Sequence, residues 1–528
     1  MEREERSPWA PFTYKIFAVV WTATVVSNIG TWMYSAAAGW LMTDLTRNAF
    51  TISLVQVASN FPVFLFALVA GALSDILDKR RYLIAGEIAT TILSAAFAAM
   101  VWFHDVTPGT LLLFMFLIAA AGALTAPAWQ AVVPELVPRK VLPAAVSANS
   151  AGINVSRAIG PAIAGEIIRP FGIVAPFIAN AVSNLGVIGA LILWRPAKKT
   201  ESGLPAERFT NAMRRGLRYA LNSAGLRATF VRIVAFFLFA SAYWALLPLI
   251  ARDRIGGGPE IYGLLLGAIG IGAVGGAFMI PALTARIGPD RLVGAAGIGT
   301  ALALVMFALA RDPLTALVAS LIAGVCWIAT IASVGVSAQV SVPDWVRGRG
   351  LAMYLTVFFG SMTAGSALWG QLAGAIGVPR ALLAAAVGVI IAIPLTWRWK
   401  LQTSGTIDLT PSAHWPTPVV SREVANDRGP VLVTLEYRVA HHKDVAAFVS
   451  SMNRLRRERL RDGAYQWGIF EDIAEPRRFL ETFYIESWIE HLRQHQRVTN
   501  ADRYLQEHVN GLLEEPVNIT HLVAPPPK

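Results

Sequence analysis

Charged side chains inside long apolar runs are the residues of this sequence best suited to chemistry. Arg157 lies near the middle of one such run, whereas Glu87 and Glu166 lie near the ends of two others. An ionisable residue inside a bilayer is costly and usually belongs to a solute pathway, a proton relay or an ion pair. We therefore expect Arg157 to face a cavity or to pair with an acid. Glu87 and Glu166 are candidates for proton coupling, although either could simply reach the membrane interface.

A short polar turn, "GALSDILDKRR", interrupts the apolar sequence from Gly71 onward and places Asp75 beside Lys79, Arg80 and Arg81. Two interpretations compete. The turn is either a solvated loop that only sets topology, or a charged latch. In the latch, Asp75 pairs with Arg80 or Arg81 and favours one of two helix arrangements.

Two histidines, His491 and His495, are spaced four residues apart in a soluble segment, so metal or haem binding must be considered. No metalloprotease motif surrounds them and no further ligand is evident from the sequence. The pattern therefore favours a structural role, and we predict no metal site and no cofactor.

The composition indicates what must position these residues. Of 528 residues, 55% are hydrophobic and 15% are charged, whereas soluble domains are about 25% charged. The chain is therefore expected to be a membrane protein with the lipid bilayer as a partner. The net charge of +11 then reflects basic cytoplasmic loops and not nucleic-acid binding. The lone Cys326 can form no internal disulfide.

Apolar runs long enough to cross a bilayer, about 20 residues each, recur twelve times. They are expected at 13–43, 50–77, 82–103, 108–134, 141–169, 172–194, 228–252, 260–285, 291–310, 313–341, 350–376 and 380–399. The expected domains are an N-terminal six-helix half (1–195), a cytoplasmic central loop (196–226), a C-terminal six-helix half (227–400), a linker (401–428) and a cytoplasmic domain (429–528). The predicted fold is thus an all-α membrane bundle followed by an α+β domain.

The C-terminal domain alternates strands and helices in a ferredoxin-like order. Strands are expected at 430–439, 465–473, 477–487 and 518–524, and helices at 443–463, 487–499 and 500–515. Such sheets often pair through an exposed face, so the tail predicts a possible homodimer. "GIGAVG" (270–275) matches a dinucleotide motif only formally, since it lies inside an apolar helix, and packing explains its glycines better.

The distribution of Lys and Arg predicts the orientation. Basic residues gather in the even-numbered loops and in the central loop, and the odd-numbered loops are poorer in them. By the positive-inside rule, both termini are then cytoplasmic. We expect a multi-pass protein of the bacterial inner membrane.

Two segments recur along the chain. "GALSDILDKRR" (71–81) aligns with "PALTARIGPDR" (281–291), and "VPELVPRK" (133–140) aligns with "VPDWVRGR" (342–349), at nearly one offset. The repeat predicts two related six-helix halves about an axis along the membrane normal, a build known from transporters.

The first of these loops resembles the cytoplasmic loop signature of the major facilitator superfamily. Ile76 stands where that signature usually has Arg, Asp78 where it has Gly, and Ala285 where the second half would have Asp. The residues that carry the resemblance are Gly71, Leu73, Asp75, Lys79, Arg80 and Arg81, with Arg286, Gly288 and Arg291 in the second half.

A second motif, "RAIGPAIAG" (157–165), resembles the Gly-Pro signature of drug and proton antiporters through Gly160, Pro161 and Gly165. "SNIGTWMYSAAAGWLMTDLT" (27–46) resembles the first span of the enterobactin-exporter-like branch. The tail is similar to the dimeric modules related to antibiotic-biosynthesis monooxygenases through "SWIEHLRQH".

These resemblances imply an exporter that works by alternating access and is coupled to protons, with a small amphiphilic organic substrate of siderophore or drug type. The alternative is a membrane-tethered enzyme with a monooxygenase-like tail. Polar and aromatic residues within the spans predict a roomy, mostly apolar cavity. These are Asn28, Trp32, Gln56, Asn60, Gln130, Asn154, Tyr243, Trp244, Trp327, Gln339 and Tyr354.

Overall fold

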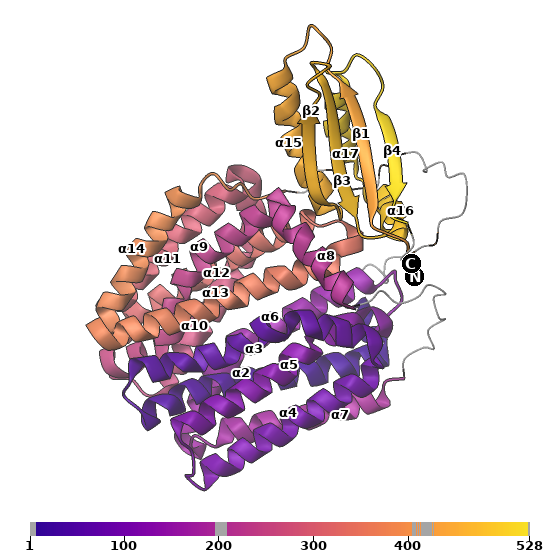
Figure 1. Cartoon of the computed structure of the whole chain (residues 1–528). Coiled ribbons are helices and arrows are strands. Elements are labelled where there is room, and N and C mark those ends of the chain that lie inside the picture. Colours follow the sequence, from indigo (N-terminus) through magenta and orange to yellow (C-terminus); the bar gives the residue numbers. More distant parts are fainter. Residues whose placement is uncertain are drawn as a thin grey trace. The chain divides into compact units, whose positions relative to one another are not determined.

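The computed structural model describes residues 7–195, 209–403 and 427–525, together with positions 408, 410, 412, 415 and 425. The chain divides into two compact units (Figure 1). The bundle unit comprises Met1–Pro205, Phe230–Gly335 and Tyr354–Trp399. The tail unit comprises Ala206–Thr229, Val336–Met353 and Lys400–Lys528.

Twelve helices of 19 residues or more lie in the described part of the chain, and each coincides with one predicted span. They are α2 (Lys15–Leu45), α3 (Ala49–Ile76), α4 (Lys79–Trp102), α5 (Pro108–Leu136), α6 (Leu142–Phe171), α7 (Ala175–Leu193), α9 (Ala224–Leu249), α10 (Pro259–Ile287), α11 (Pro289–Leu309), α12 (Pro313–Val340), α13 (Arg347–Ile376) and α14 (Val378–Thr396). Short helical turns are η1 (Ala10–Thr13), η2 (Ile250–Arg254) and η3 (Asp344–Val346).

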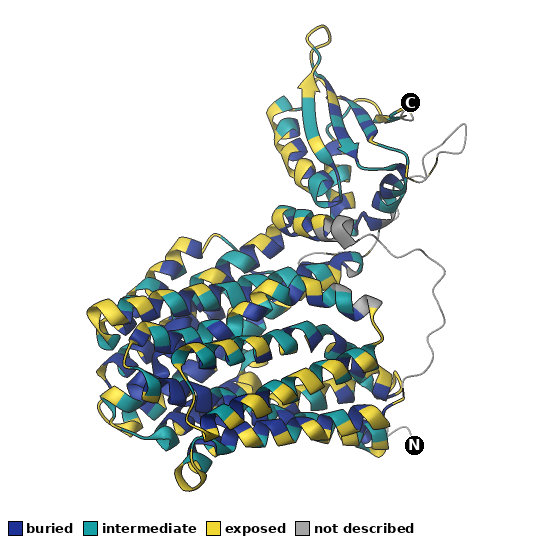
Figure 2. Cartoon of the chain, turned by 60° about the horizontal axis from the view of Figure 1, so that its bottom comes forward, coloured by how far each residue is buried: buried dark blue, intermediate teal, exposed yellow. Residues whose placement is uncertain are grey.

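Among the described residues, eleven of these helices are long and apolar enough to cross a membrane. Helix α6 has the length but not the apolar character, because Ser, Asn and Arg interrupt its sequence "LPAAVSANSAGINVSRAIG". The apolar side chains on the outside of the bundle support a lipid environment. Ile271 and Phe278, for example, are 63% and 82% exposed, and other large apolar side chains of the bundle helices are exposed as well. Figure 2 shows that exposed positions are distributed over these helices. A soluble monomer rarely exposes this much contiguous apolar surface.

Local sequence explains where several helices begin. Asn48 and Asp78 accept hydrogen bonds from the first backbone N–H groups of α3 and α4, and Thr107 forms a capping box with Thr110 at the start of α5. Proline occupies the first turn of many others, where its missing N–H costs nothing. Gly288 ends α10 and precedes α11 with φ +79°, a conformation that glycine adopts without strain.

The tail unit contains a four-stranded antiparallel sheet in the order β2-β3-β1-β4. Its elements are β1 (Val431–Arg438), α15 (Val445–Arg461), β2 (Tyr465–Glu471), β3 (Arg478–Ile485), α16 (Trp488–Arg497), α17 (Asn500–Asn510) and β4 (Asn518–Val523). This confirms the predicted order of elements, with β4 as an edge strand. Alternate β1 residues from Val431 to Tyr437 are buried and pack with Phe448 and Met452 of α15.

The expected central loop contains a helix, α8 (Phe209–Asn222), that belongs to the tail unit. Arg218 Nη1 donates a hydrogen bond to the carbonyl of Gly463 (2.8 Å), and Tyr219 Oη donates one to the carbonyl of Ser341 (2.9 Å). Tyr219 also packs edge-on against Trp345 of η3. The tail domain is therefore joined to α8 and to the segment between α12 and α13. Most of the predicted linker lies outside the described residues.

Candidate functional site

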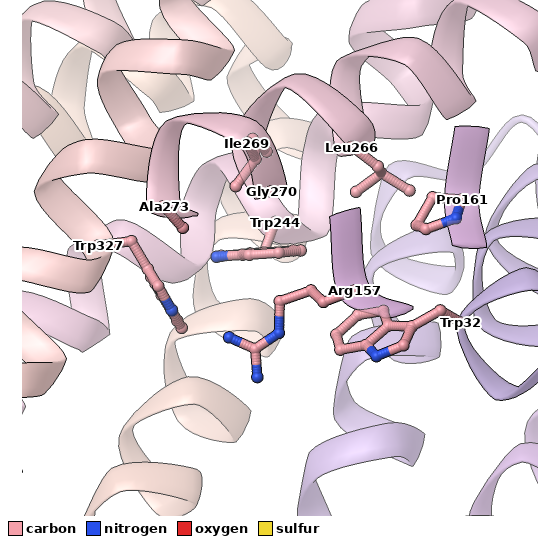
Figure 3. A pocket seen from close by; sticks show the side chains of 9 residues that line it. All are labelled: Trp32, Arg157, Pro161, Trp244, Leu266, Ile269, Gly270, Ala273 and Trp327. Carbon is pink, nitrogen blue, oxygen red and sulfur yellow. The ribbon is translucent and has the colours of Figure 1, made fainter. Parts of the chain in front are cut away.

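An aromatic-lined pocket lies inside the bundle unit, where helices of the two predicted halves meet (Figure 3). Its volume is about 10 Å³, which is room for about one water molecule, so side chains pack closely at this point. The lining residues are Trp32, Arg157, Pro161, Trp244, Leu266, Ile269, Gly270, Ala273 and Trp327.

Arg157 of α6 is the charged residue of this pocket. Its guanidinium lies 5.2 Å from the ring centre of Trp32 and points into the space between Trp32, Trp244 and Trp327 (Figure 3). Its buried Nε has no hydrogen-bond partner, and Arg157 forms no ion pair with any residue that the structure describes. A cation–π contact gives partial compensation. Arg157 thus lines a pocket, and no acid pairs with it in the described part of the chain.

The opposite wall of the pocket is an aromatic cluster from α9, α12 and α13. The rings of Trp244 and Trp327 lie 5.3 Å apart, and Phe237 and Phe358 pack on Trp327 at 4.9 and 6.1 Å. Tyr243 completes the cluster beside Trp244. Within the described chain, the buried Trp244 Nε1 and Tyr243 Oη have no hydrogen-bond partner. The pocket therefore combines apolar ring faces, a fixed positive charge and unsatisfied donors.

Sequence analysis found three of the five cluster residues but missed Phe237 and Phe358. A phenylalanine in an apolar span gives no sign of whether it faces lipid or a pocket, so no signal distinguished them. Among the other predicted cavity residues, Trp32 also lines the pocket, and the rest do not. Tyr243 packs behind it; Asn28, Gln56, Asn60, Asn154 and Tyr354 are half-buried; and Gln130 and Gln339 are exposed.

Glycines let α6 approach α10 beside the pocket. A Cβ atom on Gly263 would lie 2.5 Å from the carbonyl oxygen of Pro161 and 3.1 Å from Cα of Gly165. A Cβ on Gly270 would lie 2.5 Å from Cα of Ala158. Gly160 instead lets α6 approach α2, because a Cβ there would lie 2.6 Å from Cβ of Trp32. The "RAIGPAIAG" motif thus lies at the contact between the halves. The packing role predicted for "GIGAVG" is confirmed at Gly270.

Two ion pairs join the halves at the end of the bundle where α2 ends and α10 begins, here named the distal end. Arg252 of η2 lies 2.5 Å from Asp44 and donates to the hydroxyl of Thr43 (2.9 Å). Arg47 lies 3.8 Å from Asp253. The distal end is therefore closed. The sequence did not indicate these two ion pairs, because the two partners of each pair lie about 200 residues apart in the chain.

The polar turn after α3 is held by its basic residues. Lys79 pairs with Glu135 of α5 at 2.7 Å. Arg80 donates from Nε to the carbonyl of Leu191 (2.9 Å) and from Nη2 to that of Ile192 (2.5 Å), so it satisfies the C-terminal end of α7. The side chain of Asp75 lies outside the described residues, so the latch remains a prediction.

The two candidate coupling acids lie apart from the pocket. Glu87 is half-buried on α4 and accepts a hydrogen bond from Trp129 Nε1 of α5 (3.2 Å). Glu166 is exposed on α6.

A second cavity, of about 620 Å³, lies within the tail unit and was not predicted. Tyr219, Arg461 and Glu458 are among its lining residues. Burial, reinforced by the charge of Asp502, raises the pKa of Glu458 to about 9. Ionisable side chains therefore line part of the cavity, and one of them is a carboxyl group that favours its neutral form.

The bundle fold is similar to that of solved transporters. A POT family transporter in complex with a thioalcohol-conjugated peptide gives a TM-score of 0.59 at 12% identity, over 72% of this chain and 94% of that one. A nucleoside transporter gives 0.58 at 13% identity, over 73% and 99%. The sequence also matches the family described as transmembrane secretion effector over residues 6–526. The chain belongs to this family. It is thus a major facilitator superfamily transporter, as the loop signature predicted, and not a member of an enzyme family.

Relatives within the superfamily are distant. The staphyloferrin A transporter of Staphylococcus aureus is 25% identical over 49% of this chain and 65% of its own length. Macrolide efflux protein A of Streptococcus pyogenes is 22% identical over 49% and 66%. The multidrug efflux pump Tap of Mycolicibacterium fortuitum is 25% identical over 70% and 92%. The chain thus spans just under two thirds of the length of the first two relatives. The resemblances to the enterobactin-exporter-like branch and to monooxygenase-like tails stay predictions.

Proposed function

We propose that this secretion effector family member exports small amphiphilic organic molecules from the cell by alternating access. The observation that carries the proposal is Arg157, which has no acidic partner among the described residues and faces an aromatic pocket between the two halves. A cation inside a membrane span without a counter-ion is expensive. It is stabilised when a substrate supplies the missing negative charge.

The pocket chemistry favours one class of substrate. A planar carboxylate can accept two parallel hydrogen bonds from a guanidinium, and an aromatic or apolar body can pack on Trp244 and Trp327. We therefore propose an amphiphile with an anionic end. The siderophore and drug efflux relatives are named for small organic molecules, which supports this size class and says nothing of the anionic end.

Alternating access requires that the closed state opens to each side in turn. We propose that α6 also crosses the membrane, which brings the number of spans to twelve, because it packs between α2 and α10 and carries Arg157. We further propose that the distal end faces away from the cytoplasm and that both termini are cytoplasmic in the bacterial inner membrane, from the loop charges.

The orientation is testable with single cysteines in a Cys326→Ala background. Ser412→Cys should resist an impermeant thiol reagent in intact cells, whereas His104→Cys, in the loop after α4, should react. The reverse pattern would overturn the orientation.

Proton coupling is the proposed energy source, and Glu87, Glu166 and Asp75 are the candidate coupling groups. The deciding experiment measures efflux of a compound panel from vesicles, with and without an imposed pH gradient. We expect anionic amphiphiles to be transported faster with the gradient, and Arg157→Met to abolish the preference for anions. Transport of anions by Arg157→Met at the wild-type rate would refute the role of Arg157, and indifference to the gradient would refute proton coupling.

We also propose that the tail forms a homodimer through the sheet face that its helices leave open. Phe470 and Leu480 are neighbours in the β2–β3 register, and they are 60% and 41% exposed. Light scattering of the full-length protein in detergent should give a dimer. The dimer should be lost when both residues are changed to serine, whereas a monomeric wild type would exclude this interface.

A further inference from the structure

Three histidines of the tail unit come together although they are distant in the sequence. His491 and His495 are one turn apart on α16, and His521 lies on the edge strand β4. One ring nitrogen from each lies within 4.8 Å of the others. The ring centres of His491 and His521 are 4.7 Å apart, as are those of His491 and His495. The sequence showed only the pair on α16, since nothing in it indicated that β4 would bring a third.

The spacing of the ring nitrogens fits a shared metal ion. Nε2 of His491 and Nε2 of His495 are 3.2 Å apart. Two nitrogens bound to zinc at about 2.0–2.1 Å in tetrahedral geometry are roughly 3.3 Å from each other. His521 contributes a ring nitrogen that lies within 4.8 Å of the nitrogens of both.

The surroundings of His491 hold its ring in place. His491 is 1% exposed, and its Nε2 lies beside Nε2 of His495. Its Nδ1 has no hydrogen-bond partner among the described residues.

One nearby positive charge must be accounted for. Arg459 stacks on Trp415, which in turn packs against His495. The Arg459 guanidinium is neutralised by the fully buried Glu481, at 3.2 Å. The charge facing the histidines is therefore small, and the indole of Trp415 lies between Arg459 and His495.

We infer that His491, His495 and His521 form a site for one divalent transition metal ion of the kind that three imidazoles bind, such as Zn²⁺. Three protein ligands leave a fourth position for water or another ligand. Imidazole also suits copper, nickel and iron, so the class of metal follows from the donors. The inference does not depend on the proposed transport function.

The test uses the full-length protein in detergent, with any affinity tag removed and metals stripped by a chelator. Zn²⁺ is titrated in competition with a chromophoric chelator, and thermal unfolding is followed with and without Zn²⁺. The wild type should bind one Zn²⁺ per chain and unfold at a higher temperature when it is bound.

The informative variant is His521→Ala, because His521 is half-buried on an edge strand and its loss should leave the fold intact. We expect at least a tenfold weaker affinity and no thermal shift, and the same for His495→Ala. The matched control replaces the exposed His441, His442 and His508 by alanine and should bind like the wild type. Three results would overturn the site: no stoichiometric zinc, unchanged affinity in His521→Ala, or loss of binding in the control.

Discussion

The contact between α6 and α10 can be disturbed by a single methyl group. In Gly263→Ala, the new Cβ would lie 2.5 Å from the carbonyl oxygen of Pro161 and 3.1 Å from Cα of Gly165. Both neighbours are backbone atoms, so no side-chain rotation relieves the clash. The two helices must move apart, and we expect the closed arrangement of the halves to be destabilised.

The size of the effect follows from a matched control. Gly275 lies on the same helix, and a Cβ there meets nothing within 4 Å. Replacing either glycine by alanine gains about 1 kcal/mol of helix propensity, whereas overpacking costs about 1–3 kcal/mol at Gly263 alone. The difference between the variants is therefore about 1–3 kcal/mol, which corresponds to roughly 5–150-fold in the ratio of closed to open states.

The assay reads the closed state at the distal end. In a Cys326→Ala background, Arg47→Cys and Asp253→Cys should be cross-linked by a short bifunctional reagent, because the side chains that they replace approach to 3.8 Å. Gly263→Ala should lower the cross-linking yield and the rate of efflux from vesicles, and Gly275→Ala should change neither. If the two variants behave alike in both measurements, the glycine contact does not control closure.

Four further predictions concern single residues. Arg157→Lys keeps the charge but loses the forked geometry, so efflux of anionic substrates should fall about tenfold or more while thermal stability is kept; full activity would contradict its role as a substrate contact. Asp44→Asn should weaken the ion pair with Arg252, which is partly exposed and worth at most about 1 kcal/mol. The yield of the cross-link between Arg47→Cys and Asp253→Cys should therefore fall by no more than about fivefold, and an unchanged yield would show that this ion pair does not hold the distal end closed. The Asp75→Asn variant should insert normally but transport poorly, because the latch loses its negative charge. Transport at the wild-type rate would show that the turn is a solvated loop that only sets topology. The pKa of Glu458 in the folded protein, about 9, exceeds its ordinary value of 4.5. Between these two pH values the folded state binds more protons than the unfolded state, so the protein loses stability as the pH rises. Glu458→Gln should therefore raise the unfolding temperature at pH 8 but not at pH 4.5, and equal shifts of the unfolding temperature at both pH values would refute the pKa argument.

The bundle was predictable because hydrocarbon thickness imposes a length on every span. Each long helix of the structure coincides with a span predicted from the sequence. This includes α6, which has the length of a span although Ser, Asn and Arg interrupt its apolar sequence. The tail sheet was predictable for a similar reason. The alternation in β1 is a direct consequence of burying one face of a strand.

The site was only partly predictable, because a one-dimensional pattern does not show which side of a span faces the interior. Arg157 stood out since a charge in lipid needs an explanation, and its neighbour Trp32 was a polar-edged aromatic. Phe237 gave no such signal. His521 became visible only when β4 was seen to pair beside β1 and to face α16. Helix α8 escaped notice because it is amphipathic and contains no apolar run of spanning length.

The spacing along α6 connects the substrate site with the movement of the halves. Arg157, Pro161 and Gly165 are four residues apart, so they lie on one face of the helix. That face lines the pocket at Arg157 and Pro161 and meets α10 at Gly165. A displacement of α6 against α10 must therefore move the guanidinium relative to Trp244 and Trp327. A substrate anion that binds Arg157 in one arrangement more tightly than in the other shifts their populations by that difference in affinity. The charge of Arg157 and the glycine contact thus act on the same equilibrium between the two arrangements, and a change to either one alters their populations.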